Sequence, residues 1–166
     1  PKFARQMTHL MNYYEELTGE TLVWGESLLC SLLPPEFAHA YHENYFAEYE
    51  RAGLREQKRI LVETYDRVGE MRRARLFAGA GGRNFTLTQI IFLSELEKLT
   101  RGGGNYRGIS AALRGRVIEN LAAVLADENL KINLIVARDE DAAQLKLIVR
   151  DYDGFAVNGA IFSIWS

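Results

Sequence analysis

Polar side chains follow two short apolar runs that the sequence predicts as neighbouring parallel strands. Glu26 and Ser27 come after Leu22–Trp24, while Glu63 closes a second run, KRILVE, and Thr64 follows it. In open α/β sheets, ligands bind in the crevice beyond the carboxyl ends of the strands. Carboxylates and hydroxyls placed there would hold a small polar ligand or act on it as acid and base.

Aromatic residues flank the same two strand ends. Trp24 lies just before Glu26, and Tyr65 lies just after Glu63, so both could offer a flat face to a sugar or another ring. The alternative is that all these side chains only cap strand ends, because a position in a fold does not name a ligand. The candidate ligand-binding residues are Trp24, Glu26, Ser27, Glu63 and Tyr65.

The histidines and the cysteine give weaker signals. His39 and His42 share one face of a predicted helix and could hold a metal ion with Glu43, but histidines on a solvated surface are more common and a site needs further ligands. Cys30 has no local base, so a small buried thiol is expected. The sequence has no HExxH, CxxC, GxSxG or P-loop motif, and neither a metal nor a cofactor is expected.

Length and composition indicate an ordinary globular domain. The 166 residues suffice for one domain with a core, and a net charge of −2 gives no general attraction to nucleic acid or to anionic membranes. Cys30 alone excludes an internal disulfide and fits a reducing, cytoplasmic compartment. No run of roughly twenty apolar residues predicts a membrane span. The start at Pro1 suggests a fragment that lacks an N-terminal domain.

The first half of the chain predicts a βαβ unit behind a helix. Phe3–Leu17 carries an apolar stripe at helical spacing, expected to pack on the sheet, with an oligomer seam as the alternative. Glu20–Ser27 predicts a strand, the aromatic stripe of Phe37–Gly53 predicts a helix, and Arg55–Thr64 predicts a second strand. Strands joined by such a crossover run parallel.

The middle of the chain alternates between helix and strand signals. Asp66 is expected to cap a helix that ends by Gly79. Asn84–Phe92 predicts a strand, and a capping-box pattern predicts a short helix from Ser94. The apolar spacing from Ile109 predicts another helix, ending before Leu121.

The last third is expected to complete the sheet. Apolar runs at Leu121–Leu125 and Ile132–Val136 predict an antiparallel hairpin that turns at Asp127–Asn129, and Leu145–Val149 predicts one more strand. Behind Asp153, a closing helix is expected from the helical spacing of Val157, Ile161, Ile164 and Trp165.

These elements together predict an α/β protein. Residues 1–166 form a single domain whose mixed sheet combines a parallel βαβ core with a late antiparallel hairpin, and helices pack on that sheet.

Several stretches resemble one known architecture. ETLVWGES, LPPEFAHAYHENYFAEYERAGLREQKRILVE, LAAVLADENLKINLIVARD and LKLIVRDYDGFAVNGAIFSIW resemble the phospholipase-D-like fold, and more closely the C-terminal effector domain of TrmB-like transcriptional regulators. The resemblance covers nearly the whole chain and rests on the order of elements. It implies a sensor or dimerisation domain that follows a winged-helix DNA-binding domain, which is not visible here.

The sequence departs from active phospholipase D at the catalytic motif. Those enzymes need His-x-Lys followed by an Asp, and this sequence contains no His-x-Lys. Arg138-Asp139-Glu140 follows the Ile/Val-rich strand, and its acidic residues would repel a phosphodiester. The resemblance therefore implies the fold without the catalysis.

The sequence thus predicts a non-catalytic domain of a transcriptional regulator. It would bind a small-molecule effector, with a sugar as one candidate, and form a homodimer, and it would reach DNA only through a separate domain. An effector achieves this only if it binds the two states of the protein with different affinity. Two alternatives stay open: an enzyme that uses Glu26 or Glu63 on a small molecule, and a domain that binds only other proteins.

Overall fold

The computed structural model describes most of the chain between Gly19 and Arg138. The described residues are 6, 9–10, 12–13, 15–17, 19–24, 32–78, 85–138, 140, 152–157 and 160–165. For Trp24 and for 152–157 and 160–165, only the course of the strand is described.

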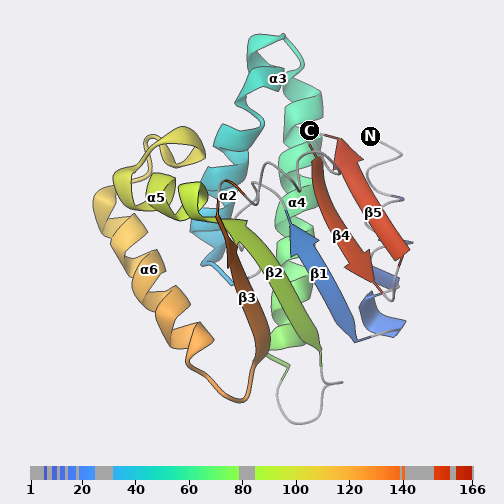
Figure 1. Ribbon diagram of the computed structural model, residues 1–166. Coiled ribbons are helices and arrows are strands. Elements are labelled where there is room, and N and C mark those ends of the chain that lie inside the picture. The colour runs from blue at the N-terminus through green and yellow to red at the C-terminus, as the bar shows by residue number, and fades with distance from the viewer. Residues whose placement is uncertain are drawn as a thin grey trace.

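The elements alternate between strands and helices along the chain (Figure 1). In chain order they are β1 (Glu20–Trp24), α2 (Pro35–Tyr45), α3 (Ala47–Arg51), α4 (Arg55–Leu76), β2 (Thr86–Phe92), α5 (Leu93–Arg101), the 3₁₀ turn η2 (Gly104–Tyr106), α6 (Ala111–Leu125), β3 (Lys131–Ala137), β4 (Tyr152–Val157) and β5 (Ala160–Trp165). Among these described residues, no helix combines the length and the apolar character that a membrane crossing requires.

The strands form one mixed sheet in the order β3-β2-β1-β4-β5. β1, β2 and β3 run parallel, with Leu22 opposite Thr88 and Leu87 opposite Ile132. β4 runs antiparallel to β1, and β5 runs antiparallel to β4. The α/β class and the presence of parallel strands, both expected from the sequence, are confirmed, but the parallel partner of β1 is β2 and not the expected strand at Arg55–Thr64.

The main core lies between one face of the sheet and the helices. Along β2 the buried residues alternate, so Leu87 and Ile91 point into the helical layer, as a period of two requires. Phe37 and Tyr41 from α2 and Val117 from α6 meet them there. In Figure 1, α2 and α4 lie behind the parallel strands, and α6 runs beside β3.

The predicted strand at Arg55–Thr64 is wrong, because this segment begins the 22-residue helix α4. Ile60-Leu61-Val62 suggested a buried strand. The ion pairs of Arg59 with Glu56 and Glu63, however, join side chains three and four residues apart, which is the spacing of neighbours on a helix. Asp66 therefore lies inside α4 and does not cap a new helix.

The predicted hairpin at Asp127–Asn129 is also wrong. Leu121–Leu125 is the last part of α6, where Val117 and Leu121 are buried on one face at a spacing of four residues. The turn at Asp127 connects this helix to β3, a strand that the sequence predicted correctly. Leu145–Val149 lies outside the described residues.

The predicted closing helix behind Asp153 is replaced by the antiparallel strands β4 and β5. Strands are favoured by β-branched and aromatic side chains, and the segment contains four of them: Ile161, Phe162, Ile164 and Trp165. The pair Asn158-Gly159 between the strands is a sequence signal for a tight hairpin turn, and it outweighs the spacing argument.

A three-way ion pair ties α2, α3 and α4 together. Nζ of Lys58 on α4 lies 2.5 Å from Oε2 of Glu43 on α2 and 3.0 Å from Oε2 of Glu50 on α3. Hydrogen bonds to Glu43 and then to Glu50 raise the pKa of Lys58, so the lysine stays charged through the neutral range.

Ion pairs of Glu15 hold the described part of the N-terminal segment against α4. Leu10 and Leu17 are exposed, so the expected packing of these two side chains on the sheet is wrong. Glu15, in contrast, is buried and lies 2.7 Å from Arg72 and 2.6 Å from Arg75, both on α4. The other four residues of the expected stripe lie outside the described residues: Phe3, Met7, Met11 and Tyr14.

Replacing Glu15 should therefore destabilise the fold strongly. Glu15→Gln leaves Arg72 and Arg75 without their buried carboxylate, and breaking such a pair costs about 3–5 kcal/mol. Urea unfolding should show this loss, whereas the control Glu16→Gln, which changes an exposed neighbour, should stay within about 0.5 kcal/mol of wild type. Equal stability of the two variants would contradict the structural role of Glu15.

Candidate functional site

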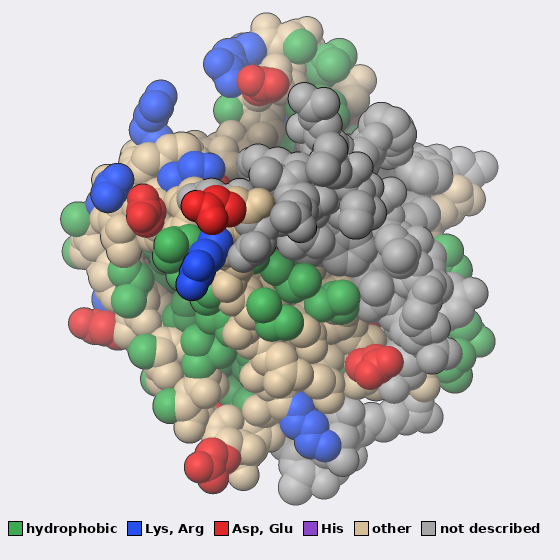
Figure 2. All heavy atoms as spheres, in the orientation of Figure 1, with side chains coloured by type: hydrophobic (Ala, Val, Ile, Leu, Met, Phe, Trp, Pro, Cys, Tyr) green, Lys and Arg blue, Asp and Glu red, His purple; other side chains and the backbone are tan. Residues whose placement is uncertain are grey.

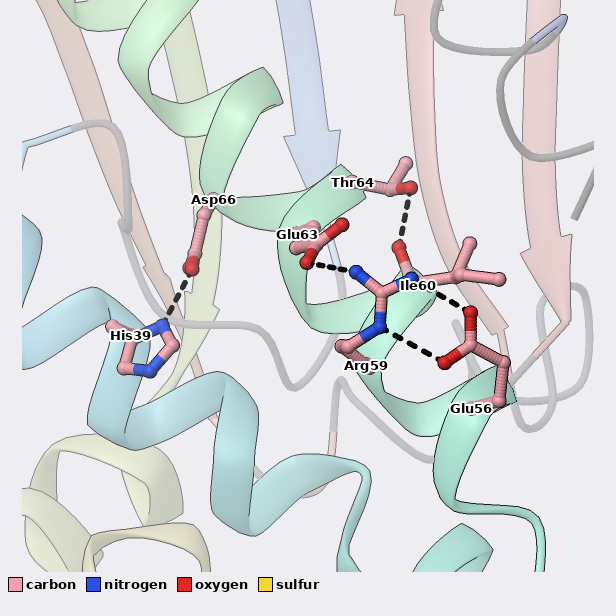
Figure 3. Close-up of polar contacts among 7 residues, drawn as sticks. All are labelled: His39, Glu56, Arg59, Ile60, Glu63, Thr64 and Asp66. Carbon is pink, nitrogen blue, oxygen red and sulfur yellow. Dashed lines mark hydrogen bonds and ion pairs between the residues drawn. The ribbon is translucent and has the colours of Figure 1, made fainter.

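The structure does not bring the candidate residues from the sequence together at the strand ends. Trp24 ends β1 as expected, and Glu26 and Ser27 lie outside the described residues. Glu63 and Tyr65, however, lie on α4, so their predicted position beyond a strand is wrong. Figure 3 shows Glu63 directed at Arg59 on its own helix, where the exposed pair stabilises α4.

Tyr65 belongs to a cluster of aromatic rings between α2 and α4. Its ring centroid lies 5.0 Å from that of Phe46, 5.5 Å from that of His42 and 6.4 Å from that of Tyr45. The rings of Phe46 and His42 meet Tyr65 nearly edge-on, an arrangement that aromatic pairs favour. Tyr65 therefore contributes to helix packing, and no open face for a sugar is needed to explain it.

The best-defined polar cluster joins α2 and α4 through one shared carboxylate. Nδ1 of His39 lies 2.6 Å from Oδ2 of Asp66, and Nδ1 of His42 lies 2.6 Å from Oδ1. Exposure falls from 57% for His39 to 23% for Asp66 and 2% for His42, so the cluster runs from the surface into the helix interface. Figure 3 shows Asp66 pointing from α4 toward His39 on α2.

The geometry fixes the protons on the two imidazoles. An ionised carboxylate only accepts hydrogen bonds, so each Nδ1 facing Asp66 carries a hydrogen. In a neutral imidazole of this tautomer, Nε2 is a hydrogen-bond acceptor. Partial burial raises the pKa of Asp66, but hydrogen bonds from His42 and His39 outweigh this, and the pKa lies below its usual value.

A hollow of about 290 Å³ opens beside this cluster. We call it the α2–α4 hollow. Among the described residues, its lining comes from α2 and from the second half of α4: Pro35, Glu36, Ala38, His39, His42, Asp66, Gly69, Glu70 and Arg73. Gly69 is buried in α4 and has no side chain to fill the space. This size suits a small molecule.

A second hollow of about 350 Å³ lies where the N-terminal segment meets α4 and β2. Glu15 and Arg75 line it but pair with each other, and the guanidinium of Arg75 also lies 5.5 Å from the ring centre of Phe85. The charged groups of this hollow are thus occupied in holding the fold together, as the burial of Glu15 indicates. The α2–α4 hollow is the stronger candidate.

The described residues do not support the metal site considered for His39, His42 and Glu43. Glu43 pairs with Lys58, and the Nδ1 atoms of both histidines face Asp66. Within the described ranges, no group of three or more His, Cys, Asp or Glu side chains is arranged to hold a metal ion.

The sequence contained only half of the signal for this cluster. The spacing of His39 and His42 was visible, since residues three apart share a helix face. Asp66 follows them after more than twenty residues and was expected to cap a helix, because nothing in the local sequence indicates that α4 packs against α2.

Comparison of the chain with models of protein families, with curated proteins and with solved structures found no match in any of the three. The functional argument therefore depends on the geometry of the chain itself.

The Asp66 cluster should make the acid limb of the stability curve steeper. The pKa of Asp66 is lower in the folded protein than in the unfolded chain, so its stabilisation is present above the unfolded value of about 3.9 and is lost as the pH falls through the folded value. Asp66→Asn should cost about 1–3 kcal/mol at neutral pH and much less once the pH has fallen below the lowered pKa of Asp66 in the folded protein. Urea unfolding across pH measures both quantities.

Glu119→Gln, which changes an exposed carboxylate on α6, serves as the control for this comparison. It should leave the acid limb as in wild type. A difference between Asp66→Asn and wild type that stays constant from neutral pH to acid would show that the charge of Asp66 does not carry the effect.

Proposed function

We propose that this chain is a non-catalytic, ligand-sensing domain of a transcriptional regulator, and that its effector binds in the α2–α4 hollow. The observation that carries the proposal is the polar lining of that hollow, where two helices share one carboxylate through His39 and His42. A ligand seated between two helices contacts both, and it can therefore favour one arrangement of the helices over another.

The absence of a phosphodiesterase motif supports a binding role. No His-x-Lys occurs anywhere in the sequence, and these residues supply nucleophile and phosphate contact in phospholipase D enzymes. The finer assignment, a phospholipase-D-like fold related to TrmB effector domains, belongs to the same proposal. Its support is the mixed sheet with parallel strands, although the second expected strand is helical.

A second candidate function is general acid–base catalysis at the same hollow. His39 is exposed, and its Nδ1 is held by Asp66, which orients the ring as a carboxylate orients a catalytic histidine. It differs from an enzyme that acts through Glu26 or Glu63, since Glu63 pairs with Arg59 and Glu26 lies outside the described residues. The two functions share a site and differ in turnover.

A ligand screen read out by thermal melting tests the sensing proposal. A ligand present at a hundred times its dissociation constant stabilises the folded state by about 2.7 kcal/mol, which shifts the melting temperature by several degrees. His39→Ala should abolish the shift, and Glu119→Gln on α6 should preserve it. Stabilisation that is the same in His39→Ala would place the ligand elsewhere.

Turnover assays separate the two candidate functions. The wild-type domain should release no product from phosphodiester or glycoside substrates above the level of the His39→Ala variant. Turnover that depends on His39 would replace the sensing proposal by the enzymatic one.

We also propose that the domain forms a homodimer through the outer face of α6. This helix buries one apolar stripe and exposes another, which contains Ala111, Gly115, Ile118, Ala122 and Leu125. Ile118 is 40% and Leu125 39% exposed, and Figure 2 shows hydrophobic side chains along this side of the molecule.

A second copy is the occupant that fits this stripe. Two antiparallel α6 helices centred on Ile118 would set Ala111 against Leu125, so a small side chain meets a large one at each end. A Cβ at Gly115 would meet no atom within 4 Å, so packing within one chain does not require glycine there, although glycine costs the helix about 1 kcal/mol.

Charging the stripe should therefore separate the copies. Ile118→Arg should leave a folded monomer, because Ile118 is not part of the core, and sedimentation at a series of concentrations measures the mass. Glu119→Gln should remain dimeric. A wild-type protein that is monomeric at every concentration would contradict the proposed dimer interface on α6.

A further inference from the structure

The lining of the α2–α4 hollow has a defined charge pattern. Glu36 stands in the first turn of α2 and Glu70 on α4, and both carboxylates are exposed at the hollow. Neither carboxylate forms an ion pair or a hydrogen bond with another residue that the structure describes. Two carboxylates from facing helices thus offer acceptors to a ligand.

The histidines add to the acceptor side of the hollow. Asp66 occupies both Nδ1–H groups, so a neutral His39 presents Nε2 as an acceptor. His39 is the more exposed of the two rings, and it lies one turn after Glu36 on the same helix. A ligand that binds these acceptors must carry hydrogen-bond donors. A protonated amine supplies the donors and also the positive charge that the carboxylates attract.

Arg73 supplies the opposite charge on the same wall. Arg73 follows Glu70 by three residues on α4, and its side chain also lines the hollow. A guanidinium binds a carboxylate through paired N–H donors, and it can do so while it keeps a neighbouring contact, since it has five donors.

We propose that the ligand of this hollow is a small zwitterion of the α-amino acid type, an inference that rests on the proposed sensing function. The amine lies among Glu36, Glu70 and His39, and the carboxylate lies against Arg73. The volume of about 290 Å³ accommodates such a molecule. Glu36, Glu70 and Arg73 then each face a ligand group of opposite charge.

A sugar fits this hollow less well. Sugars stack on flat aromatic rings, and the lining contains no Phe, Tyr or Trp among the described residues. Tyr65, expected at first as such a ring, packs instead among Phe46, Tyr45 and His42. A sugar also offers the carboxylates of Glu36 and Glu70 no cationic group.

Titration calorimetry with the individual L-amino acids tests the inference on the whole chain. Methylamine and acetate, which are the two halves of the zwitterion, and glucose serve as comparison ligands. At least one L-amino acid should bind, and the three comparison ligands should bind at least tenfold more weakly. Loss of one charge-assisted hydrogen bond corresponds to roughly a tenfold to hundredfold change in affinity.

Three variants of the lining and one control variant locate the binding site. Glu70→Gln and Glu36→Gln should each weaken the amino acid about tenfold and leave acetate unchanged, because both remove only negative charge at the rim. Arg73→Met should weaken the amino acid and leave methylamine unchanged. Glu119→Gln is the control and should bind as wild type does.

The outcomes separate the two proposals. If glucose or acetate binds in a manner that depends on His39 and no amino acid does, the zwitterion inference is overturned and the sensing function stands. If no compound of any class binds, both fall. Amino-acid binding that survives Glu36→Gln, Glu70→Gln and Arg73→Met together also overturns the inference, since the ligand then lies elsewhere.

Discussion

The parallel pairing of β1 with β2 is the constraint on which the rest of the fold depends. Parallel neighbours require the chain to return from the end of one strand to the beginning of the next. α4 makes this return, and at about 1.5 Å per residue its 22 residues span about 33 Å, which exceeds the length of β2. α2 packs beside this long helix, and both helices cover the same face of the parallel strands, so the α2–α4 interface follows from the sheet topology.

Polar contacts hold α4 in place at three levels along its length. The buried ion pair of Glu15 with Arg72 fixes one end of α4, and Lys58 fixes the other end to α2 and α3. Asp66 lies between them and binds two histidines of α2. Buried charges confer little net stability, because desolvation offsets attraction, but an alternative packing would leave them unpaired. They therefore select one arrangement of α4 over its competitors.

The sequence predicted elements correctly wherever local period and local chemistry agreed. β2 alternates buried and half-buried residues over most of its length, and the first part of α6 was predicted from its helical spacing, although its end at Leu121–Leu125 was predicted as a strand. α4 was missed because Ile60-Leu61-Val62 fits a strand while Glu56, Arg59 and Glu63 fit a helix. Packing against α2 decided between the two, and it decided the site as well. His39 and His42 were visible as a pair, but Asp66 joins them only through tertiary structure.

The same geometry limits how a ligand could act. Asp66 on α4 already accepts hydrogen bonds from both histidines of α2. A ligand that contacts only α4 binds equally well to every position of α2, so it cannot favour one arrangement of the two helices over another. Glu36 and His39 come from α2, whereas Glu70 and Arg73 come from α4, so one small molecule in the hollow would join both helices. Moving α2 against α4 would also move the buried Tyr41 of α2 toward or away from Tyr106 in η2, whose ring centre lies 5.2 Å from that of Tyr41. Packed side chains therefore connect the hollow with η2, which precedes α6, the helix proposed as the dimer interface.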